Sequence, residues 1–349
     1  WYFDDYHSIA DNPNLRSTEG LQHIVRAYIY RGIVQLTYAL DWHLSDNLGL
    51  YETSTEGEPT GRQSATVYHI SSIIYHLLVV VGVFLLIRRL LLLLHKTDQT
   101  GELENYREIN YIPLLTALVF GIHPVHTEAV TYLSGRASVL ATLEYVWAIL
   151  LLLIAAERFG FFDNSVKRKG PQDYCLGSAA LLGTVFCFVL GIGTKEIIVT
   201  MPVMGTIILG IIIAHRVSVR SAFRRLVPIC VVFVGLLIGF FAYRYVTLGD
   251  FIAVPDAKAR PWWVNVLSQI GVLVFYYLPR QLVPVSLCID PQVPLISSIM
   301  HPRVIVGAFV LVGMIAVAFT SVRHSPLIAI GLAWYLISLT PTSSVIPLG

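Results

Sequence analysis

The sequence has few charged residues. Asp, Glu, Lys and Arg make up only 13% of its 349 residues, whereas a soluble domain carries about 25%. Lys and Arg number 24 and Asp and Glu number 22, so the basic excess typical of nucleic-acid binding is missing and we expect no nucleic-acid partner. A hydrophobic fraction of 55% excludes intrinsic disorder. So few charges could not cover the surface of a soluble enzyme of this size. A polytopic membrane protein remains.

Cysteine pairs and metal-ligand spacings are also lacking. The four cysteines form no paired motif, so neither a disulfide framework nor a zinc site is expected. No acidic cluster has the spacing of a metal site, and we predict neither an essential metal nor a resident cofactor. The chain begins at Trp1 and ends in an apolar stretch without a polar tail. We interpret it as a fragment of a longer protein.

Long apolar runs dominate the remainder of the chain. A bilayer core about 30 Å thick requires roughly 20 apolar residues in a helix. The segments that meet or approach this length are residues 66–86, 111–122, 137–156, 174–192, 197–214, 226–243, 304–319 and 326–339. Residues 262–278 are apolar as well, and their leading tryptophan pair favours an interfacial or re-entrant helix over a full crossing. The sequence therefore predicts an all-α, polytopic integral membrane protein.

Basic residues in short connections orient these spans. The connections 88–107, 158–169 and 216–225 each hold four Lys or Arg residues, so the positive-inside rule assigns them to the cytoplasm. They alternate with the base-poor connections 123–136 and 193–196, which then face outward. We divide the chain into a first outer loop at 1–65 and a transmembrane helical domain at 66–349. Apolar residues at near-helical spacing in 21–44 predict interfacial helices in that loop, followed by a polar, mobile loop at 52–63.

A second group of charged and polar residues gathers at the predicted outer face. Charges at a membrane edge are costly and are functional candidates by default. Together they would line one outward polar cavity with acids and bases. They are Asp4, Asp5, His123, His126, Glu128, Arg136, Lys195, Glu196, Arg244 and Asp290.

Structural roles compete with functional ones for these residues. Asp4 and Asp5 could cap a surface helix, His123 before Pro124 could end a helix, and Arg244 could extend to the interface. His69 and His76 lie seven residues apart, and we interpret them as packing residues in preference to ligands. The mid-span residue Glu144 is expected to be neutral or hydrogen-bonded to another helix, and we assign it no role.

The chemistry of the group favours an anionic, lipid-linked substrate. Lys binds phosphate as a point charge and Arg binds it through two parallel hydrogen bonds. A nearby carboxylate can act as the general base toward a hydroxyl, and an apolar wall suits a lipid tail. These features indicate either an enzyme acting on a lipid-linked phosphate or a transporter with a proton relay. Transporters, however, usually place charges near the midplane between repeated halves, and neither feature is visible here.

Several motifs resemble those of the transmembrane and tetratricopeptide-repeat O-mannosyltransferases and their bacterial relatives. The similarity runs in the same order over nearly the whole chain, and the HPVHTEAV segment is the most specific. Departures occur at Gly32, where the family often has Pro, and at Ser72, where it often has Asn. The matching segments are 3–9 (FDDYHSI), 12–16 (NPNLR), 123–130 (HPVHTEAV), 134–136 (SGR), 194–202 (TKEIIVTMP), 287–290 (LCID) and 341–347 (PTSSVIP).

The resemblance implies a GT-C glycosyltransferase. Such an enzyme takes a sugar, with mannose as the candidate here, from a polyprenyl-phosphate donor and places it on a protein hydroxyl outside the cytoplasm, with inversion. An acid in the first outer loop acts as the base, so the resemblance assigns that role to Asp4, with Asp5 as the alternative. His126, Glu128, Lys195 and Arg244 would flank the donor phosphate or the acceptor.

The implied partners are the polyprenyl-phosphate lipid, the protein acceptor and membrane lipids. The amino-acid sequences of 197–202 and 341–347 resemble the bacterial relatives more closely than the animal members of the family. The active site would then face the periplasm from the inner membrane, or the lumen of the endoplasmic reticulum in a eukaryote. A first span and tetratricopeptide repeats, usual in the family, would lie outside this chain. A catalytically silent membrane scaffold in a larger complex remains a further alternative.

Overall fold

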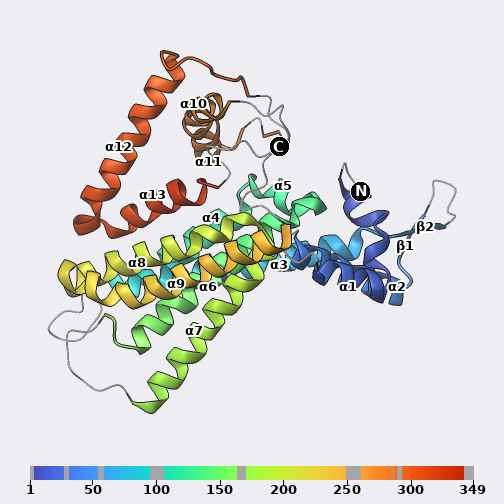
Figure 1. Ribbon diagram of the computed structural model, residues 1–349, viewed down its shortest axis with the longest axis horizontal. Coiled ribbons are helices and arrows are strands. Elements are labelled where there is room, and N and C mark those ends of the chain that lie inside the picture. Colours follow the sequence, from blue (N-terminus) through green and yellow to red (C-terminus); the bar gives the residue numbers. More distant parts are fainter. Residues whose placement is uncertain are drawn as a thin grey trace. The chain divides into compact units, whose positions relative to one another are not determined.

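A computed structural model of the chain describes residues 4–26, 31–53, 59–94, 106–162, 170–248, 261–285, 287–288 and 293–341. Helices dominate these residues (Figure 1), as the sequence predicts. Two short strands, β1 (Tyr51–Thr53) and β2 (Pro59–Gln63), pair antiparallel. The architecture is that of an all-α polytopic membrane protein.

All eight apolar segments are helical. Among the described residues, six helical stretches are long and apolar enough to cross a membrane: Thr66–Leu94, Leu133–Arg158, Pro171–Ile192, Glu196–Arg216, Val219–Val246 and Pro302–His324. They contain α3 (Thr66–Leu94), α6 (Arg136–Arg158), α7 (Pro171–Ile192), α8 (Met201–Arg216), α9 (Val219–Leu248) and α12 (Pro302–His324). The shorter apolar helices lie in α4 (Tyr106–Ile122) and α13 (Pro326–Ser338).

The helices form two compact units. The first comprises residues 1–89, 105–151 and 181–198, and the second comprises 90–104, 152–180 and 199–349. The helices α3, α6 and α7 each contribute to both units. The division into an outer loop at 1–65 and a membrane domain at 66–349 concerns the membrane topology and stays a prediction.

The N-terminal segment of the first unit is folded onto the membrane helices. It contains η1 (Tyr6–Ala10), η2 (Pro13–Leu15), α1 (Thr18–Arg26) and α2 (Gly32–Asn47). Apolar side chains from these elements share one buried cluster with residues of α3 and α6, because the sequence places them on one helical face. The cluster comprises Ile9, Leu15, Ile24, Val34, Tyr38, Ala39, Tyr68, Leu133, Ala137 and Leu140. The helical structure predicted for 21–44 is thus found in α1 and α2, and its interfacial placement stays a prediction.

The expectation of a mobile loop at 52–63 is wrong for the part that the structure describes. Strands β1 and β2 pair there, and the Asp46 carboxylate at the end of α2 accepts hydrogen bonds from both. The Tyr51 hydroxyl donates to Asp46 Oδ1 at 2.8 Å, and the Gln63 amide donates to the same oxygen at 3.2 Å. Composition alone did not reveal this long-range anchoring.

The second unit is built around α8. Its side chains Met201, Met204, Ile208 and Ile212 are fully buried. The apolar run at 262–278 forms α10 (Trp262–Val272) and η5 (Leu273–Tyr277), which continue into α11 (Leu278–Leu282). The Tyr335 hydroxyl of α13 donates to the Leu273 carbonyl at 2.7 Å. The run is thus packed within this unit, and its placement in the interface remains a prediction.

Candidate active site

The two acids at the start of the chain have different surroundings. Asp4 is exposed, whereas the side chain of Asp5 is buried. Asp5 Oδ1 accepts two hydrogen bonds from Ser134, one from the backbone N–H at 2.8 Å and one from the hydroxyl at 2.7 Å. Tyr132 hydrogen-bonds with Asp4 and with Ser134, and burial raises the pKa of its hydroxyl. Asp5 is therefore held by the protein, while Asp4 remains accessible beside it.

The turn that receives Asp5 lies between α5 (His126–Thr131) and α6. It contains η3 (Leu133–Gly135), and the Tyr38 hydroxyl donates to the Leu133 carbonyl at 2.7 Å. Gly135 is required by a close approach, because a Cβ there would lie 2.7 Å from the Glu128 carbonyl oxygen. The turn thus fixes α5 against the start of α6 and brings Asp5 to Ser134, 129 residues away in the chain.

A cation lies near acids of the same unit. Lys195 is half-buried, and its ammonium donates to Ser138 Oγ at 2.8 Å. Burial lowers the pKa of Lys195, repulsion from Arg31 adds to this effect, and attraction by Glu196 and Glu128 opposes it. Arg31, Glu128 and Glu196 thus lie close enough to Lys195 to influence its charge. Glu128 and Glu196 are both exposed.

Arg31 is positioned by an unusual backbone. It occupies the left-handed region with φ 59° at the start of α2, a conformation uncommon for residues other than glycine. The next residue but one, Ile33, donates its N–H to the Gly193 carbonyl at 3.0 Å. This bond ties α2 to the connection that carries Lys195.

Three histidines lie together at the junction of α4 and α5. The ring centroid of His126 lies 5.3 Å from that of His76 and 6.2 Å from that of His123. Burial, together with repulsion from the neighbouring His76 and His123, lowers the pKa of His126 to about 4. His126 is consequently neutral near pH 7 and offers a hydrogen bond rather than a positive charge. No group of three potential ligands among the residues described could hold a metal ion.

Arg136 departs from its expected place in the outward cavity. Its side chain is fully buried and forms an ion pair of 2.6 Å with Asp41. The guanidinium also donates to other oxygens and lies 4.7 Å above the Tyr38 ring. These further acceptors are Ser72 Oγ at 3.2 Å, Thr37 Oγ1 at 3.3 Å and the Tyr68 carbonyl at 2.7 Å.

Burial raises the pKa of the Asp41 carboxyl, and the Arg136 guanidinium counteracts that effect. Arg136 is an interior structural residue because its donors are directed to groups of the protein. The Ser72 hydroxyl is one of its acceptors. Ser72, which stands where the resembled family often has Asn, therefore contacts Arg136 inside the protein.

The remaining predicted residues are placed as follows. Glu144 is buried and accepts a hydrogen bond from the Thr194 hydroxyl at 2.9 Å, as expected for a mid-span acid. Arg244 belongs to the second unit, where its Nε is buried and has no hydrogen-bond partner among the residues that the structure describes. Asp290 lies outside the residues that the structure describes.

The first unit therefore gathers most of the predicted site residues and adds others. The additional residues are Arg31, Asp41, Tyr132, Ser134 and Ser138. Ser134 belongs to the SGR motif and Tyr132 precedes it closely, so their position in the chain was a usable signal. Nothing in the sequence alone pairs Asp41 with Arg136.

Fold and site together define an all-α polytopic membrane protein that carries acids and a lysine at the helix ends of one unit.

The chain is similar to curated proteins that are named protein O-mannosyl-transferases. It is 26% identical over 314 residues to one from Caenorhabditis elegans, which covers 85% of this chain and 37% of that protein. It is 26% identical over 234 residues to TMTC3 of Mus musculus, covering 63% of this chain and 20% of that protein.

A third relative, TMTC1 of Mus musculus, is 29% identical over 153 residues, covering 42% of this chain and 14% of that protein. The chain thus spans between 14% and 37% of the length of these relatives. No protein-family model matches the sequence. No solved structure matches it either.

Proposed function

We propose that this chain forms the membrane part of a glycosyltransferase. It moves a sugar from a polyprenyl-phosphate donor to a hydroxyl of a protein acceptor on the non-cytoplasmic side. The names of the relatives support sugar transfer to proteins, with mannose as the candidate sugar. The observation that carries the proposal is the pairing of an exposed Asp4 with an anchored Asp5 in the unit that also holds Lys195.

Asp4 is the general base in this proposal. Its exposed carboxylate can accept the proton of an acceptor hydroxyl, whereas Asp5 is buried and already receives two hydrogen bonds from Ser134. Asp5 is thus a positioning residue that fixes the backbone on which Asp4 stands. Tyr132 hydrogen-bonds with Asp4 and limits the orientation of its carboxylate.

Lys195 binds the donor phosphate. Its flexible ammonium suits a phosphate as a point charge, and its partner in the structure is the neutral hydroxyl of Ser138 rather than an ion-paired carboxylate. Replacing that hydroxyl with a phosphate oxygen would exchange a neutral acceptor for a charged one, which makes a stronger hydrogen bond. The neutral ring of His126 can donate a further hydrogen bond to the sugar or the phosphate.

The reaction is a single displacement. The acceptor oxygen loses its proton to Asp4 and forms a bond to the anomeric carbon of the sugar. The bond from that carbon to the phosphate oxygen breaks, and the electron pair leaves with the polyprenyl phosphate. Lys195 stabilises the charge that develops on the phosphate. Attack opposite the leaving group inverts the anomeric configuration.

The test distinguishes the roles of Asp4 and Asp5 by measuring sugar transfer after each acid is replaced by its amide. Purified protein in detergent is given radiolabelled polyprenyl-phosphate mannose and a peptide rich in Ser and Thr, and incorporation is counted. Asp4→Asn should abolish transfer, because an amide is not a base. Asp5→Asn should retain much of the transfer, because its amide oxygen can still accept from Ser134, whereas Asp5→Ala should lose it.

Glu19→Gln is the matched control, since Glu19 is an exposed acid of the same segment. Thermal unfolding of each variant checks that the protein remains folded. Full transfer by Asp4→Asn together with inactive Asp5→Asn would reverse the two roles. If the unaltered protein transfers no label but exports the donor lipid across vesicles, the transporter alternative is correct.

A further inference from the structure

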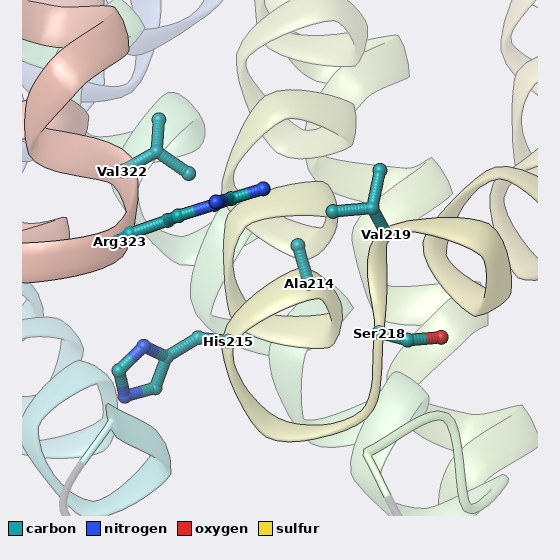
Figure 2. A pocket seen from close by; sticks show the side chains of 6 residues that line it. All are labelled: Ala214, His215, Ser218, Val219, Val322 and Arg323. Carbon is teal, nitrogen blue, oxygen red and sulfur yellow. The ribbon is translucent and has the colours of Figure 1, made fainter.

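A cavity of ≈ 440 Å³ lies in the second unit, where α8, α9 and α12 approach one another (Figure 2). None of the residues that line this cavity belongs to the candidate active site. Figure 2 shows the Arg323 side chain extending from the end of α12 towards Ala214 and Val219. The other lining residues are His215, Ser218 and Val322.

The lining of this cavity is basic. Arg323 is exposed and His215 is half-buried, and no acidic residue is among the side chains that line the cavity. More basic residues, all exposed, lie at the same helix ends. These are Arg216, Arg220, Arg224 and His324.

The surrounding helices cannot supply a counter-charge. The sequence holds no Asp or Glu at all from 197 to 249, nor from 291 to its end. The helices α8, α9 and α12 therefore contribute bases without acids, and α13 contributes neither. Like charges at these helix ends repel one another, so an anion that binds between them is attracted by all of them.

The cavity lies at the ends of membrane spans. Spanning segments end or begin at Arg216, Val219 and His324. The positive-inside rule assigns this edge to the cytoplasmic side, where anionic lipids give the membrane surface a negative potential. The walls at Val219 and Val322 are apolar, and Val219 is 63% exposed, so the cavity offers a basic end beside an apolar flank.

The start of α9 is held in place independently of any ligand. The Ser218 hydroxyl accepts a hydrogen bond from the Ser221 N–H at 3.1 Å and donates to the Ser221 hydroxyl at 3.0 Å. The connection between α8 and α9 is closed by the N–H groups of Val217 and Ser218, which both donate to the Ile213 carbonyl. The wall of the cavity is consequently preformed.

We propose that this cavity binds the phosphate group of an anionic membrane phospholipid. Arg323 pairs with two phosphate oxygens through its fork of N–H donors. His215 contributes a donor, and the acyl chain near the headgroup lies along Val219 and Val322. Soluble phosphate shares the charged group but lacks the apolar part that these walls would cover.

The test measures lipid binding to the purified protein by native mass spectrometry. The probes are dioctanoyl phosphatidic acid, dioctanoyl phosphatidylcholine and inorganic phosphate. The unaltered protein should bind phosphatidic acid more tightly than either of the others. Arg323→Gln should weaken that binding about tenfold, because a charge-assisted hydrogen bond contributes on this scale.

Arg220→Gln is the matched control. It removes the same charge from the same membrane edge but outside the cavity, and should weaken binding about twofold or less because its charge is screened by solvent. Val219→Phe narrows the cavity without altering the charge and should also weaken binding. Thermal unfolding is measured for every variant, so that a folding defect is recognised.

Three results would overturn the proposal. Equal losses in Arg323→Gln and Arg220→Gln would show a diffuse basic surface and no site. Inorganic phosphate that binds as tightly as phosphatidic acid would show that the ligand is soluble. Unchanged binding in Arg323→Gln and in Val219→Phe would place the lipid elsewhere.

Discussion

Replacing Arg136 by Met should destabilise the first unit severely. Met has an unbranched apolar chain and fills much of the same space, but it donates no hydrogen bond. The Asp41 carboxylate would lose its 2.6 Å partner while its side chain remains buried. Removing one member of a buried ion pair costs about 3–5 kcal/mol of unfolding free energy, because the remaining charge loses its ionic partner. Among the described residues, only the Ser71 hydroxyl, at 2.6 Å, would still donate to Asp41 Oδ1.

The other acceptors of the guanidinium add to this cost. The Tyr68 carbonyl, at 2.7 Å, and the Ser72 hydroxyl, at 3.2 Å, would each lose a donor inside the protein. Protonation of Asp41 would relieve part of the penalty, because burial already raises the pKa of this carboxyl. A folded state that binds more protons than the unfolded state loses stability as the pH rises. The stability lost on changing Arg136→Met, measured against the unaltered protein at the same pH, should therefore be larger at pH 8 than at pH 5.

The assay is unfolding in detergent followed by tryptophan fluorescence, with Arg158→Met as the matched control. Arg158 ends the same helix and pairs with Asp173 at 2.9 Å, but the two side chains are 43% and 32% exposed. An exposed pair of this kind contributes about 0–1 kcal/mol. The double variant Arg136→Met, Asp41→Leu should recover stability, since no buried charge is left unpaired. Equal, small effects of Arg136→Met and Arg158→Met would refute the reasoning.

Three further predictions concern the candidate site. Gly135→Ala should lower stability by about 1–3 kcal/mol and reduce transfer, because the added Cβ would meet the carbonyl of the preceding helix at 2.7 Å. Gly313→Ala, which meets nothing within 4 Å, should do neither in the same unfolding and transfer assays. The stability of the unaltered protein should fall as the pH drops from 6.5 towards 4, because the pKa of His126 is lowered to about 4 and the unfolded state takes up the proton first. His126→Phe should flatten the unfolding curve measured against pH, whereas His324→Gln, at an exposed position, should leave it unchanged. Lys195→Met should raise the KM for the polyprenyl-phosphate donor about tenfold, as expected for the loss of one charge-assisted hydrogen bond, and an unchanged KM would remove Lys195 from the donor site.

The membrane helices were predictable because their signal is local. An apolar run such as 226–243 identifies a span without knowledge of any other part of the chain, since the bilayer itself supplies the apolar surroundings. The segment at 262–278 shows the limit of this reasoning. Its helical structure follows from its own residues, whereas its depth in the membrane depends on what it packs against.

The roles of the individual charges were less predictable because they depend on contacts distant in the chain. Asp4 and Asp5 are neighbours with the same chemistry, and only the approach of Ser134 makes one of them buried and the other accessible. Arg136 lies in a motif that suggests a substrate contact, yet a partner 95 residues away places it in the interior. Burial and partner choice are tertiary properties, and one sequence does not reveal them.

The two units balance their charges in different ways. In the first unit, buried charges such as Arg136 and Asp41 are satisfied by partners within the fold. In the second unit, the helices α8, α9 and α12 around Arg323 contain bases and no acids, and the proposed lipid phosphate would supply an external anion. Added salt screens exposed charges more strongly than buried ones. Moderate salt should therefore weaken the proposed lipid contact at Arg323 while leaving the stability contributed by the Arg136 network nearly unchanged, because only the former is exposed to solvent ions.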